Sequence, residues 1–226
     1  MCGRYTLTCP NEDSLIRDLP FDEFSETRIT LRPRYNVAPG QVSPVVFLQE
    51  GKPVLADAEW GFRRHSAGLT INARSETADR TAMFRDAFRE GRCLVPADGF
   101  FEWRREGRVN QPHLFRRSDG ALFVMAGVCE RGRYVVLTRD SEGEVAEIHD
   151  RMPVLLEPDD ARRWLVEGEI GEPPDLTRMA VSTRVNRLLY QRLVEFDEHF
   201  RPVPSLARWE QVTPRHYRFD LGPDRS

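Results

Sequence analysis

Short apolar runs alternate with polar turns along most of the 226-residue chain, which predicts a protein built mainly from β-strands. The sequence QEGK, at residues 49–52, has the composition of a tight turn and predicts a β-hairpin. The predicted strands lie near residues 45–48, 53–62, 93–96, 100–104, 113–116, 122–129, 134–138, 152–156 and 179–182.

Helical spacing of apolar residues appears in only a few places. Asn11 can cap a short helix over residues 14–19. Apolar residues recur at helical intervals between residues 76 and 90, which predicts one helix there. Pro158 opens a helix that continues through residues 161–166.

Many short strands with a few helices predict an α+β fold: a single domain with a largely antiparallel, partly closed β core and flanking helices. Residues 32–45 contain three prolines and a glycine, so we expect an ordered loop there. No segment has the composition of a linker. We therefore expect the domain to cover residues 1–212 and the polar residues 213–226 to form a loose tail.

The composition excludes several classes of protein. No apolar run approaches the roughly 18 residues that span a bilayer, and no basic region followed by an apolar stretch marks a signal peptide. The four cysteines form no CxxC pair or Cys/His cluster, so neither a zinc site nor a disulfide framework is supported. We expect a cytoplasmic protein with no metal, no cofactor, no membrane partner and no obligate protein partner.

The basic residues are almost all arginine, because Lys52 is the only lysine. Codon bias in a GC-rich genome explains this usage simply. Arginine also binds phosphate through its planar fork of donors. The formal net charge of −3 does not exclude DNA binding, provided that arginines gather on one face.

The second residue, Cys2, would carry two reactive groups if it became the first residue of the mature chain. Methionine aminopeptidases remove Met1 when the next residue is small, so we expect the mature chain to begin with a free amine and a free thiol on Cys2. An α-amine has a pKa of about 7.7–8.0 and a thiol one of about 8.5, so both nucleophilic forms are accessible near neutral pH.

Further polar residues stand within apolar surroundings in the stretches TINARSET, PADGFFEW and EIHDRMP. Taken singly, each of these polar residues could have a purely structural role. Asn72 could bridge a turn, Glu102 could lie on the solvent face of a strand, and His149 could belong to a surface turn. Arg74 alone is more often a salt-bridge partner than a ligand, and Trp103 is more often part of a core.

Seven stretches, in this order over residues 2–186, together resemble the SRAP family of abasic-site processing proteins, first named SOS-response-associated peptidases. The stretches are MCGRY, RYNVAPGQ, WGF, INARSET, MFRDAF, CLVPADGFFEW and IHDRMP. The resemblance implies a twisted antiparallel β core with flanking helices. It also implies a covalent crosslink between Cys2 and abasic sites in single-stranded DNA, and hence a nucleoid association when DNA is bound.

The resemblance also implies roles for particular residues. Those that assist Cys2 match Asn72, Glu102 and His149: Glu102 to take a proton from the amine, His149 to pass protons, and Asn72 to hold the amine or a sugar oxygen. Contacts to DNA are expected at Arg4, Pro39, Arg74, Met83, Trp103, Thr138 and Arg151.

One stretch departs from the family pattern. Between WGF and INAR, relatives often carry a longer loop with tryptophans that wedge against DNA, whereas this chain has only RRHSAGLT. Arg63, Arg64 or His65 could contact phosphate instead.

Two other functions stay open at the level of sequence. Cys2 and His149 could form the thiol–imidazole pair of a cysteine-type peptidase, acting on its own chain or on others. The protein could also read modified bases or single strands without a covalent bond. Because imine formation can precede strand cleavage, a weak lyase activity is expected beside crosslinking.

Overall fold

The computed structural model describes residues 2–63, 68–106, 109–171, 179–182, 194–196, 202–204, 208–213 and 216–220. The chain divides into two compact units, Met1–Val181 and Ser182–Ser226. The predicted functional residues all belong to the first unit.

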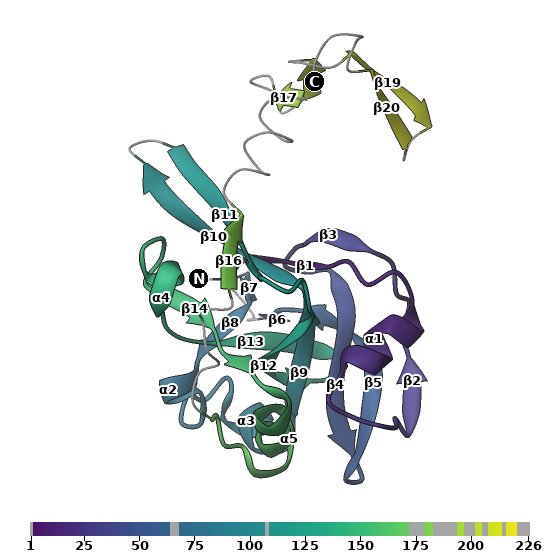
Figure 1. Ribbon diagram of the computed structural model, residues 1–226. Coiled ribbons are helices and arrows are strands. Elements are labelled where there is room, and N and C mark those ends of the chain that lie inside the picture. The colour runs from purple at the N-terminus through teal and green to yellow at the C-terminus, as the bar shows by residue number, and fades with distance from the viewer. Residues whose placement is uncertain are drawn as a thin grey trace. The chain divides into compact units, whose positions relative to one another are not determined.

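Strands dominate the first unit (Figure 1). Its described helices are α1 (Glu12–Asp18), α2 (Ser75–Ala78), α3 (Arg85–Glu90), α4 (Gly143–Ala146) and α5 (Pro158–Glu167). The described strands up to the unit boundary are β1 (Arg4–Leu7), β2 (Glu26–Arg28), β3 (Arg34–Val37), β4 (Val42–Gln49), β5 (Lys52–Trp60), β6 (Phe62–Arg63), β7 (Leu69–Thr70), β8 (Asn72–Arg74), β9 (Arg92–Ala97), β10 (Gly99–Glu106), β11 (Val109–Arg117), β12 (Phe123–Glu130), β13 (Arg133–Asp140), β14 (Arg151–Pro153), β15 (Leu155–Leu156) and β16 (Met179–Ser182).

A ring of strands forms the centre of this unit. β13, β12, β9, β4 and β5 pair in that order, and β5 pairs again with β13, which closes the ring within the described residues. At the closure, Arg133 lies opposite Glu59, and its guanidinium donates to both carboxylate oxygens at 2.8 and 2.6 Å. Closure leaves these strands with no open edge. The expected partly closed, largely antiparallel β core is therefore confirmed; parallel pairings join β13 to β5, β13 to β8 and β2 to β5.

Aromatic side chains fill the interior of the ring. Trp60 and Tyr134 are fully buried and stack with ring centroids 6.3 Å apart, and the Tyr134 and Tyr5 hydroxyl oxygens lie 2.7 Å from each other. The Trp60 indole donates to the carbonyl of Ile71 at 2.9 Å, which satisfies its buried N–H. This bond also fixes the chain immediately before β8, the strand that begins with Asn72.

The chain enters the fold through a second sheet, with described strand order β16-β11-β10-β1-β3. β1 lies inside this sheet, with Arg4 opposite Phe101 of β10 and Tyr5 opposite Val37 of β3. Asp98 holds β1 further along, because its carboxylate accepts hydrogen bonds from the Thr6 hydroxyl and from the Thr8 backbone. β1 is thus paired along both sides, by β10 and by β3, which fixes the first residues of the chain.

Several local predictions are confirmed. The Asn11 side chain caps α1 by accepting a hydrogen bond from the Ser14 backbone at 2.9 Å. β4 and β5 form the expected hairpin, whose two turn residues, Glu50 and Gly51, have φ of 53° and 74° as a type I′ turn requires. α5 begins at Pro158.

The prediction of one helix over residues 76–90 is wrong, because α2 and α3 are separate helices with a turn between them. At the break, the Thr81 hydroxyl donates to the Thr77 carbonyl at 2.7 Å, and the Phe84 backbone donates to the Thr81 carbonyl. Such local bonds offer the backbone an alternative to continuous helix. The apolar spacing reflects burial of Ala78 in α2 and of Phe84 and Ala87 at the start of and within α3.

The expectation of an ordered loop over residues 32–45 is wrong in part, because β3 and the start of β4 lie within it. The loop between these strands is a turn in which the Gln41 backbone donates to the Ala38 carbonyl at 3.1 Å. Pro39 and Gly40 occupy its centre, and Gly40 has φ of 79°, as a type II turn requires.

The second unit contains two described hairpins. The first joins β17 (Val194–Phe196) to β18 (Pro202–Pro204), and the second joins β19 (Arg208–Thr213) to β20 (His216–Asp220). The second hairpin includes residue 213, at which the loose tail was expected to begin, so the described part of that segment is strand. The domain boundary after residue 212 stays a prediction.

Candidate active site

Cys2 lies directly ahead of β1 and has no exposed surface. Its carbonyl accepts a hydrogen bond from the Asn72 Nδ2 at 2.8 Å, and its Sγ lies 3.7 Å from the Arg4 carbonyl. Burial and the nearby Glu102 carboxylate raise the pKa of the Cys2 thiol well above its ordinary value, against the positive charge of the amino terminus. The sulfur is therefore a neutral thiol at neutral pH, and the expectation that its thiolate form is accessible there is wrong, because burial disfavours the charged form.

Asn72, the first residue of β8, forms the contact between this strand and Cys2. β8 pairs in parallel with β13, with Asn72 opposite Val136, so the amide group extends from a fixed strand. While Nδ2 holds the Cys2 carbonyl, the buried Oδ1 has no hydrogen-bond partner within the described residues. A buried acceptor without a partner is destabilising, so this oxygen is suited to receive a donor from a bound group.

Glu102 lies on β10, the strand that pairs with β1, and is 1% exposed. The interpretation of this residue as the solvent face of a strand is therefore wrong, because Glu102 points into the interior. Burial raises the pKa of Glu102 to about 7, while the positive charge of the amino terminus acts in the opposite direction. A carboxyl group with this pKa exchanges protons readily near neutral pH.

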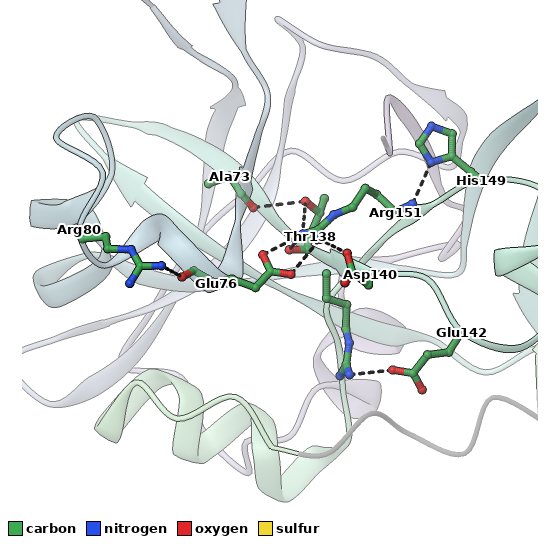
Figure 2. A network of polar contacts seen from close by, with 9 residues as sticks. Ala73, Glu76, Arg80, Thr138, Asp140, Glu142, His149 and Arg151 are labelled. Atoms are coloured by element: carbon green, nitrogen blue, oxygen red, sulfur yellow. Dashed lines mark hydrogen bonds and ion pairs between the residues drawn. The ribbon is translucent and has the colours of Figure 1, made fainter.

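His149 follows α4, and its ring is 27% exposed. Its Nδ1 accepts a hydrogen bond from the Arg151 backbone N–H at 3.0 Å (Figure 2). Burial, and then the positive charge of the amino terminus, lower the pKa of His149, although Asp150 acts to raise it. The imidazole is therefore neutral at pH 7. The same Nδ1 lies 2.9 Å from the Asp150 carboxylate, to which a protonated Nδ1 would donate.

Arg151 lies at the centre of a polar network (Figure 2). Its side chain is 10% exposed and donates to both carboxylate oxygens of Glu76, at 2.8 and 3.0 Å. It also donates to the Asp140 carboxylate and, at 2.6 Å, to the Thr138 carbonyl. Two carboxylates thus neutralise one guanidinium. The DNA contacts expected of Arg151 and of Thr138, which is 1% exposed, stay predictions.

Sequence reasoning did not identify Glu76 or Asp140 as part of the site. Glu76 stands in the stretch INARSET, but its spacing gives no sign that it meets an arginine 75 residues later. A cavity of about 410 Å³ opens beside this pair and is lined by Ser75, Glu76, Arg139, Asp140, Glu142, Ile170 and Gly171.

The other residues expected to contact DNA differ in exposure. Arg74 is exposed at the start of α2, where it lowers the pKa of Glu76 together with Arg151. Arg4 is half-buried and donates to the Gly3 carbonyl at 2.8 Å. Pro39 is half-buried in the turn between β3 and β4.

Two apolar candidates are half-buried. Met83 packs against the core from the turn between α2 and α3. Trp103 lies on β10, with its ring 6.2 Å from that of Phe101. Arg63, the last residue of β6, is exposed and lies 3.5 Å from Glu59, whereas Arg64 and His65 lie outside the described residues.

Within the described part of the chain, no cluster of three or more His, Cys, Asp or Glu side chains could hold a metal ion. In the same residues, no helix has the length and apolar character needed to cross a membrane.

The chain is similar to known proteins over most of its length. Residues 1–193 match the profile of the family described as SOS response associated peptidase (SRAP). The abasic site processing protein YedK of Escherichia coli (strain K12) is 34% identical over 182 residues, which cover 73% of this chain and 79% of YedK. The abasic site processing protein HMCES of Xenopus tropicalis is 30% identical over 185 residues, which cover 62% of this chain and 55% of HMCES.

A solved structure of a phage-related protein from Bordetella bronchiseptica shares the fold, with a TM-score of 0.66 and 28% identity. The superposition covers 80% of this chain and 93% of the other.

Proposed function

Because the chain belongs to the SRAP family, as its resemblance indicated, we propose that it captures abasic sites in single-stranded DNA through Cys2. Removal of Met1 leaves the α-amine and the thiol on this one residue. The relatives YedK and HMCES are named abasic site processing proteins, which supports the substrate. The observation that carries the proposal is that Glu102 is buried beside Cys2. Its carboxyl group has a pKa raised to about 7, which suits a base that takes a proton from an amine.

The proposed reaction joins two nucleophiles to one carbon. The Cys2 amine attacks the aldehyde of the open abasic sugar, and loss of one water gives an imine. The thiol then adds across the C=N bond, with its proton passing to nitrogen, and a five-membered thiazolidine closes. One C–N and one C–S bond form and the C=O bond is lost. The ring is far harder to reopen than the imine, so the lesion stays covered.

The neighbouring side chains supply the proton transfers. Ionised Glu102 takes a proton from the ammonium form of the Cys2 amine, which makes the nitrogen nucleophilic. Neutral His149 donates a ring proton to the sugar ring oxygen as the closed sugar opens. Asn72 holds the Cys2 carbonyl with Nδ2 and offers Oδ1 to the amine. Each general acid–base step contributes about 10²–10⁴ in rate.

The raised pKa of the Cys2 thiol favours crosslinking over peptide hydrolysis. A cysteine peptidase needs a thiolate paired with an imidazolium, which requires a lowered thiol pKa. Here burial raises the pKa of Cys2 and lowers that of His149. We therefore expect no cleavage of a fluorogenic peptide library without DNA. A weak lyase activity remains part of the proposal, because the imine also permits β-elimination.

Binding of the DNA strand is expected to depend on phosphate contacts that do not read sequence. Arg74→Ala should weaken binding to single strands of different sequence by a similar factor, and should reduce the salt dependence by about 0.7 in log K against log salt. Fluorescence anisotropy at several salt concentrations measures both quantities. Arg131→Ala is the matched control, because Arg131 is exposed in the turn before β13, whereas Arg74 lies opposite Thr138 near the other end of that strand. An equal loss in both variants contradicts this role for Arg74.

The proposed function is tested by mixing the purified protein with single-stranded DNA in which a uracil has been excised to an abasic site. Intact mass first establishes whether Met1 has been removed. On a denaturing gel, the protein band should then shift upward by the mass of the DNA and survive boiling. Processed protein that shows no shift contradicts the proposal, and a mobility shift seen only on native gels indicates a non-covalent reader.

A further inference from the structure

Tyr35 is the most exposed large hydrophobic side chain among the described residues, at 68%. It lies on β3, an edge strand of the second sheet, and the inner neighbour of β3 is β1, which begins two residues after Cys2 (Figure 1). A ring that stays in water contributes little to the stability of the core. Its exposure beside the strand that carries Cys2 therefore suggests a role in binding.

A β-bulge accounts for the exposure of Tyr35. Val37 lies opposite Tyr5 and Arg34 lies opposite Leu7, so three residue steps along β3 match two along β1. In a regular strand Tyr35 would share the face of Val37, which is fully buried. The extra residue breaks this alternation, and bulges at sheet edges commonly re-aim a side chain in this way.

β3 belongs to a basic part of an otherwise acidic chain. Residues 1–11, 27–49 and 60–75 contain one, three and three arginines, seven in all, and no aspartate or glutamate, although the formal net charge of the whole chain is −3. The second sheet brings Asp98 and Glu102 beside β1, but both carboxyl groups are buried. The charge of these three segments therefore suits a polyanion.

The three basic segments contact one another around Cys2. β1 pairs with β3, and Asn72 Nδ2 donates to the Cys2 carbonyl at 2.8 Å. Leu69 Cδ1 lies 3.4 Å from the position that a Cβ would take at Gly40, in the turn after β3. A single strand held at Cys2 is thus bordered by the segment that presents Tyr35.

We infer that Tyr35 is a further contact to single-stranded DNA, and that its ring stacks on a base beyond the lesion. The inference rests on the proposed function, because it adds a binding residue for the same strand. Tyr35 lies beside Thr6, four residues from Cys2, which is a span of about 13 Å along β1. Since every base has a π-face, this contact tolerates any sequence.

Fluorescence anisotropy tests the contact with a labelled single strand of mixed sequence, about 12 nucleotides long and without an abasic site. Tyr35→Ala should weaken binding by about 5- to 100-fold, which is the effect of losing one base stack. Tyr35→Phe keeps the ring and should bind as the wild type does. Unchanged binding by Tyr35→Ala overturns the inference. An equal loss in Tyr35→Phe also overturns it, because the hydroxyl and not the ring would then be the contact.

Val166→Ala is the matched control. Val166 is 63% exposed at the end of α5, which lies outside the three basic segments. This variant should bind the labelled strand with wild-type affinity. A loss equal to that of Tyr35→Ala would overturn the inference, because removal of any exposed apolar side chain would then have the same effect.

A scan of the DNA locates the stacked base. A tetrahydrofuran residue, which lacks both the base and the aldehyde, replaces one nucleotide at a time. At the position that meets Tyr35, this replacement should weaken wild-type binding, and Tyr35→Ala should then cause no further loss. If Tyr35→Ala causes the same loss at every position of the replacement, its ring stacks on no base and the inference is wrong.

Crosslinking separates this inference from the proposed function. An abasic trinucleotide is too short to reach from Cys2 to Tyr35, so Tyr35→Ala and the wild type should crosslink to it at equal rates. Slower crosslinking to the trinucleotide would overturn the inference, because Tyr35 would then act on the chemistry or on the fold. If the wild type binds single strands but forms no heat-stable adduct, the proposed function fails, while the anisotropy comparison still decides the role of Tyr35.

Discussion

Cys2→Ser protein forms no heat-stable adduct with abasic single-stranded DNA. Serine keeps the α-amine and the shape of the side chain, so the imine still forms. The hydroxyl is a much weaker nucleophile than the thiol, and the oxygen ring it would close reopens easily. On a denaturing gel after boiling, the shifted band should disappear. Treatment with borohydride before denaturation should restore it, because reduction of the imine gives a stable amine.

Cys9→Ser is the matched control for this change. Cys9 is also buried, at 9% exposure, and burial raises the pKa of its thiol to about 11. Its nitrogen, however, is part of a peptide bond, so its thiol can form only a labile hemithioacetal. This variant should crosslink at the wild-type rate. A stable adduct in Cys2→Ser without borohydride, or its loss in Cys9→Ser, contradicts the proposed chemistry.

Glu102→Gln slows crosslinking by about 10²–10⁴, because glutamine cannot accept the proton of the ammonium group. The reason is specific to the ionised form of Glu102, whose pKa is raised to about 7 by burial. The wild-type rate should therefore rise as pH increases through about 7. In the variant, this increase should disappear and leave the titration of the amine itself. Single-turnover crosslinking measured between pH 5.5 and 9 gives both profiles.

The same substitution is expected to stabilise the fold. With a folded-state pKa of about 7 and an ordinary value of 4.5, Glu102 binds a proton more tightly in the folded protein. Between these values the folded state holds more protons, so the free energy of unfolding falls as pH rises from 4.5 to about 7 and stays at the lower value above that. Below pH 4.5 its effect is absent. Glutamine removes a penalty of at most about 3 kcal/mol at pH 8.

Thermal melting at pH 5 and pH 8 checks this sign. Glu102→Gln should melt at a higher temperature than the wild type at pH 8, and the difference should shrink at pH 5. Glu130→Gln is the control, because Glu130 is largely exposed at the end of β12. A Glu102→Gln protein that crosslinks more slowly than the wild type but also melts at a lower temperature at pH 8 would contradict this account. Glu102 would then support the fold, and its effect on the crosslinking rate would be indirect.

The sequence predicted most of the elements because their signals are local. Alternating residues marked the strands, and the cap at Asn11 and the turn at Glu50 and Gly51 depend on neighbours a few residues apart. The break between α2 and α3 was missed because apolar spacing alone cannot distinguish one helix from two with a turn between them. β3 was missed because it is half-exposed and short, and its pairing with β1 is what makes it a strand.

The sequence indicated which residues belong to the candidate site, but not how they are arranged in space. Cys2 and Glu102 come together because β1 pairs with β10, nearly 100 residues later, and no local pattern encodes that pairing. Alternation with Phe101 and Trp103 gave the wrong face for Glu102, since neighbouring strand residues point to opposite sides and either side can be covered. Arg151 seemed available for phosphate because its partners, Glu76 and Asp140, are distant in sequence or only weakly marked.

The central claim is that the amine and the thiol of Cys2 both bond to one sugar carbon. Mass spectrometry of the crosslink tests it most directly, after digestion with nuclease and protease and treatment with iodoacetamide. The account predicts a peptide that begins at Cys2, carries the sugar remnant with the loss of one water, and resists alkylation at Cys2. A remnant on a peptide that still begins with Met1, or a Cys2 that carries the sugar and is also alkylated, would contradict it.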